Sequence, residues 1–310
     1  MFTIALALAG AVVLYASPQP EFVAAWRAGA EAALLDSTGH VHVYGSQGKV
    51  RTLTLTASGS PMVWRHAPTG FARWNSEWLV ADGTTQLKRF NASGAFIATV
   101  AVPANLFDLA VAGQTLWAAN CLSKSPSNRL WSSTDGRRFT PVPMKDDIDE
   151  PLALLYRNFM ILAGSSGGDL FIAHSFDAPL VHRIFPFSNR ATWPVAYSRS
   201  KSRASLEVIE KGVEDLTMYS SPVRDMLALP GELIVLRNRE DVRTPQGVIT
   251  QQGLRADRYG VGGRHVSSAT FAEPMKWILR SDRQHVTGVT KGGVVRVARW
   301  GKPIAGGIVR

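Results

Sequence analysis

The feature that most constrains the fold is a succession of short segments, rich in β-forming residues, that runs along almost the whole chain. HVHVYG (40–45), EWLVADG (77–83) and FMILAGS (159–165) are examples, and clusters of Gly, Asn, Asp and Ser separate such segments. Turn signals recur about every 8–12 residues, and long stretches with helical periodicity are absent. The sequence therefore predicts an all-β protein built from many short strands.

The segments fall into groups of four with a period of about 40–45 residues, which is typical of β-propeller blades. A four-stranded sheet cannot bury both of its faces alone, so blades stack around an axis and each covers its neighbour. Dividing 310 residues by such a period predicts about six or seven four-stranded antiparallel blades. We expect one propeller domain over residues 1–310, with a pair of β-sandwiches as the alternative fold.

Two segments carry family resemblances. EWLVADGTTQLKRFNASGAFIATV (77–100) resembles an NHL-type repeat, in which a strand ends in Ala-Asp and a tight turn leads to the next strand pair. RLWSSTDGRRFTPV (129–142) is similar to a BNR or Asp-box hairpin, although one residue of the usual turn is missing. In that resemblance the residues that shape and close the turn are Ser133, Asp135, Gly136 and Phe139. Both resemblances imply a propeller but no particular active site, because propellers host scaffolds, receptors and enzymes alike.

The first twenty residues allow two interpretations. The apolar stretch from Phe2 to Ala16 resembles a secretory signal, but no Lys or Arg precedes it, and it is shorter than the roughly 20 apolar residues of a membrane span. The stretch 4–17 also resembles 107–120 and 226–238, where two apolar strands flank a Gly. We expect residues 2–17 to form an N-terminal hairpin of the propeller. An excised signal would place the protein in the periplasm or outside the cell; otherwise it is cytoplasmic or part of an assembled particle.

The charge of the chain is one-sided. Lys and Arg number 34 against 24 Asp and Glu, which gives a net charge of +10, and most of the excess lies in residues 156–310. Such a surface attracts an acidic partner protein. SRSKSR (198–203) places Arg199, Lys201 and Arg203 between predicted strands, and we expect these three residues to contact the partner. Nucleic acid or another polyanion is a weaker alternative, because no run of five or six basic residues occurs.

His40 and His42 are the candidates for a metal site, because their i, i+2 spacing on a strand puts both imidazoles on one face. No carboxylate or third His follows at ligand spacing in that segment, and the other five His are scattered. The competing interpretation is a pair of solvent-facing histidines, so we expect no metal and no other cofactor. A single cysteine, Cys121, excludes a disulfide-stapled scaffold.

Two short motifs that suggest catalysis or cofactor binding fail on spacing or context. GSQGK (45–49) lacks the gap of a phosphate-binding loop, and no helical pattern follows the glycines of YGVGGRH (259–265). The sequence thus favours a non-catalytic propeller that acts as a protein-interaction scaffold or as a subunit of a larger assembly. The alternative is a propeller lyase or hydrolase for a sugar-derived or lactone-like substrate, with its site at the axial mouth.

Overall fold

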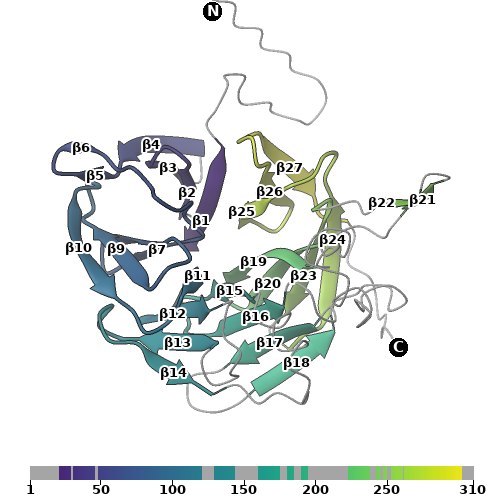
Figure 1. The fold of residues 1–310 in the computed structure, drawn as a ribbon. Coiled ribbons are helices and arrows are strands. Elements are labelled where there is room, and N and C mark those ends of the chain that lie inside the picture. Colours follow the sequence, from purple (N-terminus) through teal and green to yellow (C-terminus); the bar gives the residue numbers. More distant parts are fainter. Residues whose placement is uncertain are drawn as a thin grey trace, which may run out of the picture.

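The computed structural model describes residues 21–28, 31–45, 48–120, 129–143, 160–174, 180–184, 190–194, 223–237, 242–244, 247–249, 253–260 and 262–301. Within them the chain forms antiparallel sheets that stand around a central axis (Figure 1). This arrangement confirms the predicted all-β propeller with four-stranded antiparallel blades.

The first three blades follow the chain without insertion between their strands. The first blade comprises β1 (Phe22–Ala28), β2 (Glu31–Asp36), β3 (His40–Gly45) and β4 (Gly48–Thr54). The second comprises β7 (Gly70–Trp74), β8 (Glu77–Ala81), β9 (Gln86–Phe90) and β10 (Phe96–Ala101). The third comprises β11 (Leu106–Ala112), β12 (Thr115–Asn120), β13 (Leu130–Ser133) and β14 (Thr140–Val142). A small hairpin of β5 (Thr56–Ala57) and β6 (Ser60–Pro61) links the first two blades.

The later sheets are less regular. The fourth blade comprises β15 (Met160–Gly164), β16 (Leu170–His174), β17 (Leu180–Ile184) and β18 (Arg190–Pro194). The fifth comprises β19 (Val223–Leu229), β20 (Glu232–Arg237), β23 (Arg255–Gly260) and β24 (His265–Thr270). The hairpin β21 (Val242–Thr244) and β22 (Gly247–Ile249) is inserted in the fifth blade. A three-stranded sheet of β25 (Trp277–Ser281), β26 (His285–Val289) and β27 (Val295–Arg299) follows.

The number of blades corrects the prediction from the sequence. The described residues hold five four-stranded sheets, not six or seven, together with the three-stranded sheet. That sheet stands between the fifth and first blades, since β25 contacts both β19 and β1. The repeat period overestimated the count because it treated every part of the chain as blade, whereas the β21–β22 hairpin is inserted in the fifth blade and the β5–β6 hairpin lies between the first two.

Apolar side chains fill the interfaces between neighbouring sheets, which is what makes the ring stable. One cluster joins the first three blades, and three others join the third to the fourth, the fourth to the fifth, and the fifth to the three-stranded sheet. The last interface closes the ring, where Phe22 and Leu34 of the first blade pack with Trp277 and Val289 of the three-stranded sheet. Each sheet therefore covers the apolar flank of the next.

The innermost strands approach one another closely around the axis. Gly164 in β15 shows how closely, because a Cβ added there would lie 2.0 Å from the carbonyl oxygen of Val111 in β11. Any larger residue would push the third and fourth blades apart. Because the innermost strands lie this close together, their side chains that point to the axis share one small space.

Several predictions from the sequence fall outside the described residues. These are the hairpin over residues 2–17 and the basic segment 198–203. The single domain over 1–310 likewise stays a prediction. Among the residues that the structure describes, no helix has the length and apolar character to cross a membrane.

Candidate functional site

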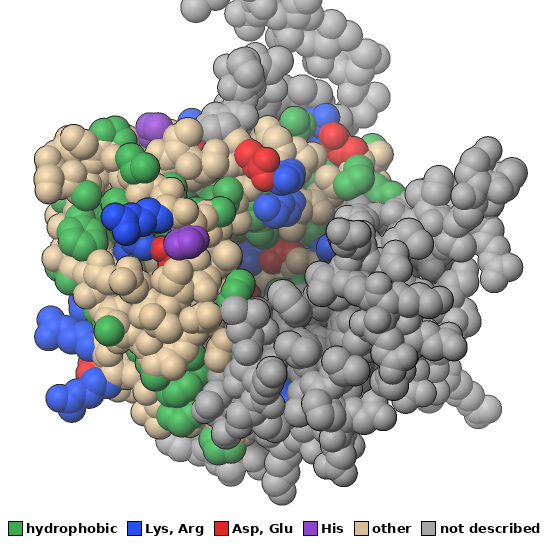
Figure 2. All heavy atoms as spheres, in the orientation of Figure 1, with side chains coloured by type: hydrophobic (Ala, Val, Ile, Leu, Met, Phe, Trp, Pro, Cys, Tyr) green, Lys and Arg blue, Asp and Glu red, His purple; other side chains and the backbone are tan. Residues whose placement is uncertain are grey.

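A cavity of about 280 Å³ lies at the axis of the ring. The first residues of the innermost strands line it, so every sheet around the axis contributes to its wall. Its ionisable residues are Arg27, Asp108, Arg224, Asp225 and Lys276, and its large apolar residues include Phe71, Phe107, Met160 and Trp277. We call this space the axial cavity. Figure 2 shows acidic and basic side chains gathered near the centre of the ring.

Arg27 lies in the wall of the axial cavity and is held by partners from two other sheets. Arg27 on β1 forms an ion pair with Asp225 on β19 and donates a second hydrogen bond to the carbonyl oxygen of Ile278, 3.1 Å away. Ala25, Arg27 and Phe71 also line a second, smaller space of about 30 Å³, so the two spaces adjoin along the innermost strands.

Asp108 and Asp225 occupy the same position in two different blades. Each is the third residue of an innermost strand, next to a shift in register against the neighbouring strand. Oδ2 of Asp108 accepts a hydrogen bond from the backbone N–H of Leu162 in the next blade at 2.9 Å. Oδ2 of Asp225 accepts one from the N–H of Ile278 in the following sheet at 2.7 Å. Both carboxylates therefore fasten one sheet to the next.

The two aspartates differ in the charge beside them. Asp108 keeps part of its surface open to the cavity, but protein encloses it on the other sides, and this burial raises the pKa of its carboxyl to about 7. The N–H groups of Leu162 and Leu109 oppose that rise, as does the charge of Arg27 at longer range. Burial also raises the pKa of Asp225, against the direct ion pair with Arg27. Asp108 thus changes its protonation near neutral pH.

Two further cations, Arg224 and Lys276, are half-buried in the wall of the axial cavity. Burial lowers the pKa of both side chains, because charge is disfavoured away from water. Nζ of Lys276 donates to the carbonyl oxygen of Phe22 at 3.3 Å and lies 4.2 Å from the ring centroid of Trp277. Both side chains thus contribute to the charged part of the cavity wall.

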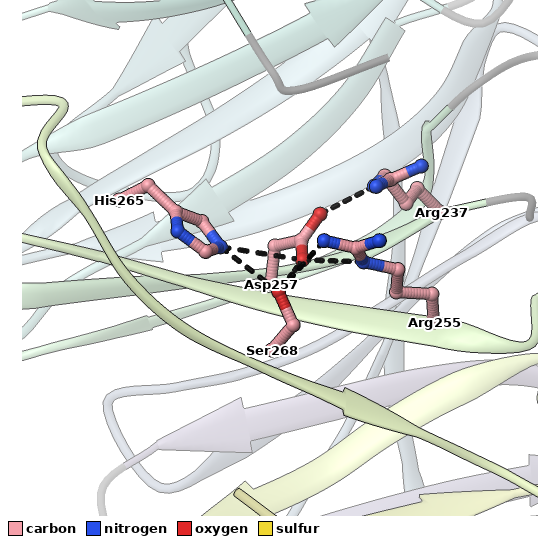
Figure 3. Close-up of polar contacts among 5 residues, drawn as sticks. All are labelled: Arg237, Arg255, Asp257, His265 and Ser268. Carbon is pink, nitrogen blue, oxygen red and sulfur yellow. Dashed lines mark hydrogen bonds and ion pairs between the residues drawn. The ribbon is translucent and has the colours of Figure 1, made fainter. Parts of the chain in front are cut away.

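A second cluster of polar side chains lies in the fifth blade, around Asp257 (Figure 3). The Asp257 side chain is fully buried and forms ion pairs with Arg237 and Arg255. Ser268 donates a hydrogen bond to it, and His265 lies 3.4 Å away. Burial opposes the ionisation of Asp257, but the hydrogen bond with His265 and the charges of the two arginines outweigh it and hold the pKa well below its usual value.

The cluster contains a Ser, a His and an Asp, yet its geometry is not that of a catalytic triad. Nε2 of His265 is 2.9 Å from Oγ of Ser268 and 3.4 Å from Oδ1 of Asp257, so one ring nitrogen faces both partners. A proton relay needs the carboxylate and the hydroxyl on opposite ring nitrogens. Ser268 also donates its proton to Asp257. The cluster therefore ties β20, β23 and β24 together.

Residues 164–168 match the spacing Gly-x-Ser-x-Gly around Ser166, a match that the sequence analysis missed. In the structure they form the turn between β15 and β16, two antiparallel strands. A nucleophile elbow instead joins a strand to a helix. The match therefore marks a hairpin turn, closed by the hydrogen bond from the N–H of Gly168 to the carbonyl oxygen of Ser165 at 3.1 Å.

The predicted metal candidates lie beside Asp36. Nε2 of the buried His42 is 2.8 Å from Oδ2 of Asp36, and Nδ1 of His40 is 3.6 Å from the same oxygen. Burial raises the pKa of Asp36, but hydrogen bonds from His42, His40 and Thr38 outweigh it and lower the pKa to about 2. Among the described residues no group of three or more potential ligands is arranged to hold a metal ion. A metal at His40 and His42 stays a hypothesis.

The predicted contact residues Arg199, Lys201 and Arg203 lie outside the described residues, so their role stays a prediction.

The residues of the axial cavity, by contrast, were not predicted from the sequence. The only trace of them there is a repeat around Asp108 and Asp225: both LFDLAVAG (106–113) and VRDMLALPG (223–231) place an Asp third in an apolar segment that is followed by Gly. This repeat indicates a shared position, but not that the two positions face one cavity.

The hairpin resemblance predicted the roles of several turn residues. Oγ of Ser133 accepts a hydrogen bond from the N–H of Gly136 at 2.9 Å, and Oδ1 of Asp135 accepts those of Arg137 and Arg138, both at 2.8 Å. The turn is therefore built from the residues named. The assignment of 77–100 and 129–142 to NHL-type and Asp-box repeats stays a prediction.

Comparison with known proteins identifies the fold and no family. No protein-family model matches the chain, and no curated protein matches it in sequence. The solved WD40 domain of Pan2 from Neurospora crassa has a similar structure, with a TM-score of 0.50 and 10% identity, over 92% of this chain and 80% of that one. BBS1N in complex with ARL6DN is more distant, with a TM-score of 0.45 and 12% identity, over 87% of this chain and 75% of that one. The likeness to the Pan2 domain agrees with the β-propeller fold described above.

Proposed function

We propose that the protein is a non-catalytic propeller that docks another protein on its outer rim, as an interaction scaffold or as a subunit of a larger assembly. The observation that supports this best is the outer strand of the second blade. β10 has the sequence FIATVA and exposes two consecutive large apolar side chains, Phe96 at 39% and Ile97 at 47%. Exposed apolar side chains on an edge strand are a template for a partner.

β10 also lacks the features that normally protect an edge strand. Charged residues and Pro keep edges from pairing with other chains, and β10 has neither. Four of the other outer strands, β4, β14, β18 and β27, carry Lys49, Pro141, Arg190 and Arg296. Beyond the bridge between Thr56 and Ala95, the outer edge of β10 meets no strand among the described residues. An extended segment of a partner can pair with it.

The surroundings of β10 indicate the chemistry of the partner. The exposed Val63 and Arg65 flank Trp64, whose ring packs on Phe90, and Phe90 packs on Phe96. The rim thus combines apolar side chains with a cation, in a chain of net charge +10. We infer a partner segment with apolar residues and neighbouring acidic ones.

A photo-crosslinker placed at Phe96, in the native host, tests this proposal. We expect it to join the chain to a specific protein, and the same crosslinker at Val297, which is 43% exposed, to give no such product. Ile97→Asp should abolish the Phe96 product, whereas Val297→Asp should leave it intact. Identical products from both positions, or no product from either, would remove the docking proposal.

A second candidate is the propeller enzyme, and Asp108 is the observation that favours it. A carboxyl with a pKa of about 7 in the wall of a cavity is suited to general acid or base catalysis. We propose sugar-derived lactones as the substrates to try. Turnover that disappears in Asp108→Asn would replace the scaffold proposal by this one, and absence of turnover in the wild type would end it.

A further inference from the structure

We propose that the axial cavity binds a small uncharged amide, whose N–H groups donate hydrogen bonds to the carboxyl of Asp108 and whose apolar body packs against Val23, Phe107 and Ile161. This inference is independent of the docking proposal, which concerns the outer rim. It requires no turnover.

Three of the innermost strands have a β-bulge at the same position beside the axial cavity. In β1, β11 and β19 the register shifts between the first and the third residue, so the second residue is skipped in the strand pairing. These second residues are Val23, Phe107 and Arg224, and all three line the cavity. Bulges re-aim side chains and are common next to functional sites. The wall of the cavity is therefore built by the same device in three blades.

The apolar part of the wall leaves side-chain surface for a ligand to cover. Val23, Phe107 and Ile161 line the cavity, and each is only partly buried. Packing of an apolar ligand body against them would remove that surface from water, which is favourable. The cavity volume of about 280 Å³ limits the ligand to a small one.

Asp108 offers hydrogen-bond acceptor sites to such a ligand. Its Oδ1 accepts the N–H of Leu109 and its Oδ2 accepts the N–H of Leu162, both at 2.9 Å. The two oxygens of a carboxylate have about four acceptor sites, so these two bonds do not saturate them. Asp108 also lines the cavity. N–H groups of a ligand can therefore reach the acceptor sites that remain.

The charges of the wall favour a ligand without net charge. Arg27 and Asp225 form an ion pair, and both act electrostatically on Asp108, in opposite directions. A cation placed beside Asp108 would be repelled by Arg27 and by Lys276, which also lines the cavity. An anion there would be repelled by Asp225 and by ionised Asp108. An uncharged ligand avoids both costs.

An amide matches both protonation states of Asp108. The carboxyl is protonated in part at neutral pH, so it both accepts and donates hydrogen bonds. A primary amide carries N–H donors and a carbonyl acceptor side by side. It donates to the ionised carboxylate, and it forms two hydrogen bonds with the protonated acid. A ketone or an ester has no N–H group and pairs with the protonated acid alone.

Calorimetric titration at pH 7 with benzamide and acetophenone tests the inference. Both molecules are uncharged and similar in size, but the amide NH₂ of benzamide is replaced by a methyl group in acetophenone. We expect benzamide to bind about tenfold more tightly, the usual effect of a hydrogen bond to a charged group. Equal affinities, or absence of benzamide binding at millimolar concentration, overturn the inference. Tighter binding of the anion benzoate or of the cation benzamidinium than of benzamide overturns it too.

Asp108→Ala tests the role of the carboxyl. It should bring the affinities for benzamide and acetophenone to about the same value, because neither ligand then has a carboxyl to pair with. A loss of stability alone would not change the ratio of the two affinities. An unchanged preference for benzamide in this variant overturns the inference.

Val23→Phe tests the place of binding, because the larger side chain fills the axial cavity. It should weaken the binding of benzamide below detection. Val297→Phe is the matched control, since it makes the same enlargement at an exposed position of β27 and should leave the affinity unchanged. If Asp108→Ala does not fold, as judged by circular dichroism, this pair of variants provides the test. Equal benzamide affinity in Val23→Phe and the wild type overturns the inference. The crosslink at Phe96 reports on the rim alone, so failure of either proposal is recognised separately.

Discussion

Asp257 in the fifth blade and Asp108 at the axis are both enclosed by protein, yet their pKa values move in opposite directions. Asp257 has two arginines, a His and a Ser as direct partners. Asp108 has only backbone N–H groups as direct partners among the described residues, with Arg27 and Asp225 acting at longer range. Burial is common to both sites, so the neighbouring cations decide the sign of the shift.

The difference separates a structural cluster from a candidate binding site. Around Asp257 the charged groups face one another and leave little demand for a ligand. At the axial cavity, Asp108 has no cation in direct contact among the described residues, and its carboxyl is protonated in part at neutral pH. A buried group whose charge is not neutralised by the fold is the better candidate for function.

The largest effect that tests this comparison is expected from Asp257→Asn. The substitution leaves Arg237 and Arg255 without the carboxylate that neutralises them, and loss of one partner from a buried ion pair typically costs about 3–5 kcal/mol. We expect the free energy of unfolding at pH 7, measured by urea denaturation, to fall by that amount. Ser268→Ala, which removes one hydrogen bond of the same cluster, should cost about 1 kcal/mol. Equal losses of unfolding free energy in the two variants would show that the ion pairs of Asp257 are not the main stabilising interactions of this cluster.

The ring could be predicted from the sequence, because each blade is built from local segments. The segment 77–90 illustrates this, since its alternation of apolar strands and a turn at Asp82 gives β8 and β9 within a residue or two. A blade needs only short hairpins, and hairpins are readable from neighbouring residues. The number of blades could not be predicted in this way, because the repeat period does not show how many residues lie in loops and insertions rather than in blade strands.

The axial cavity could not be predicted, because its residues meet only when the ring closes. Arg27 and Asp225 are 198 positions apart in the sequence, and Arg27 and Ile278 are 251 apart. The partner of His40 and His42 was missed for a simpler reason. Asp36 precedes them across the β2–β3 turn, whereas only ligands after the two histidines were considered. Spacing within one segment cannot report contacts between blades.

The next effect concerns the pH dependence of stability through Asp108. Its pKa rises from 3.8 to about 7 on folding, so the protonated carboxyl favours the folded state and stability falls as the pH rises from about 4 to about 7. The slope for one such group is about 1.4 kcal/mol for each pH unit. We expect Asp108→Asn to lack this contribution. The free energy difference between variant and wild type should therefore shift in favour of the variant from pH 5 to pH 7.

Asp282→Asn is the control for that measurement, since Asp282 is exposed and its pKa is lowered rather than raised. Its difference from the wild type should change little between pH 5 and pH 7. A flat difference for Asp108→Asn would mean that Asp108 is ionised throughout this range. The contrast between the axis and the fifth blade would then be lost.

The smallest effect concerns two carboxylates whose hydrogen-bond partners include a threonine hydroxyl. Asp36 and Asp82 occupy equivalent turns of the first two blades, and each accepts hydrogen bonds from the hydroxyl and the N–H of the Thr two residues later. Thr84→Val removes the hydroxyl that bonds Asp82 and should lower the free energy of unfolding by about 1 kcal/mol. Thr38→Val, the matched change beside Asp36, should give a similar loss. A loss as large as that of Asp257→Asn in either variant would mean that hydroxyl groups rather than cations hold these carboxylates ionised, and the electrostatic explanation of the Asp257–Asp108 difference would fail with it.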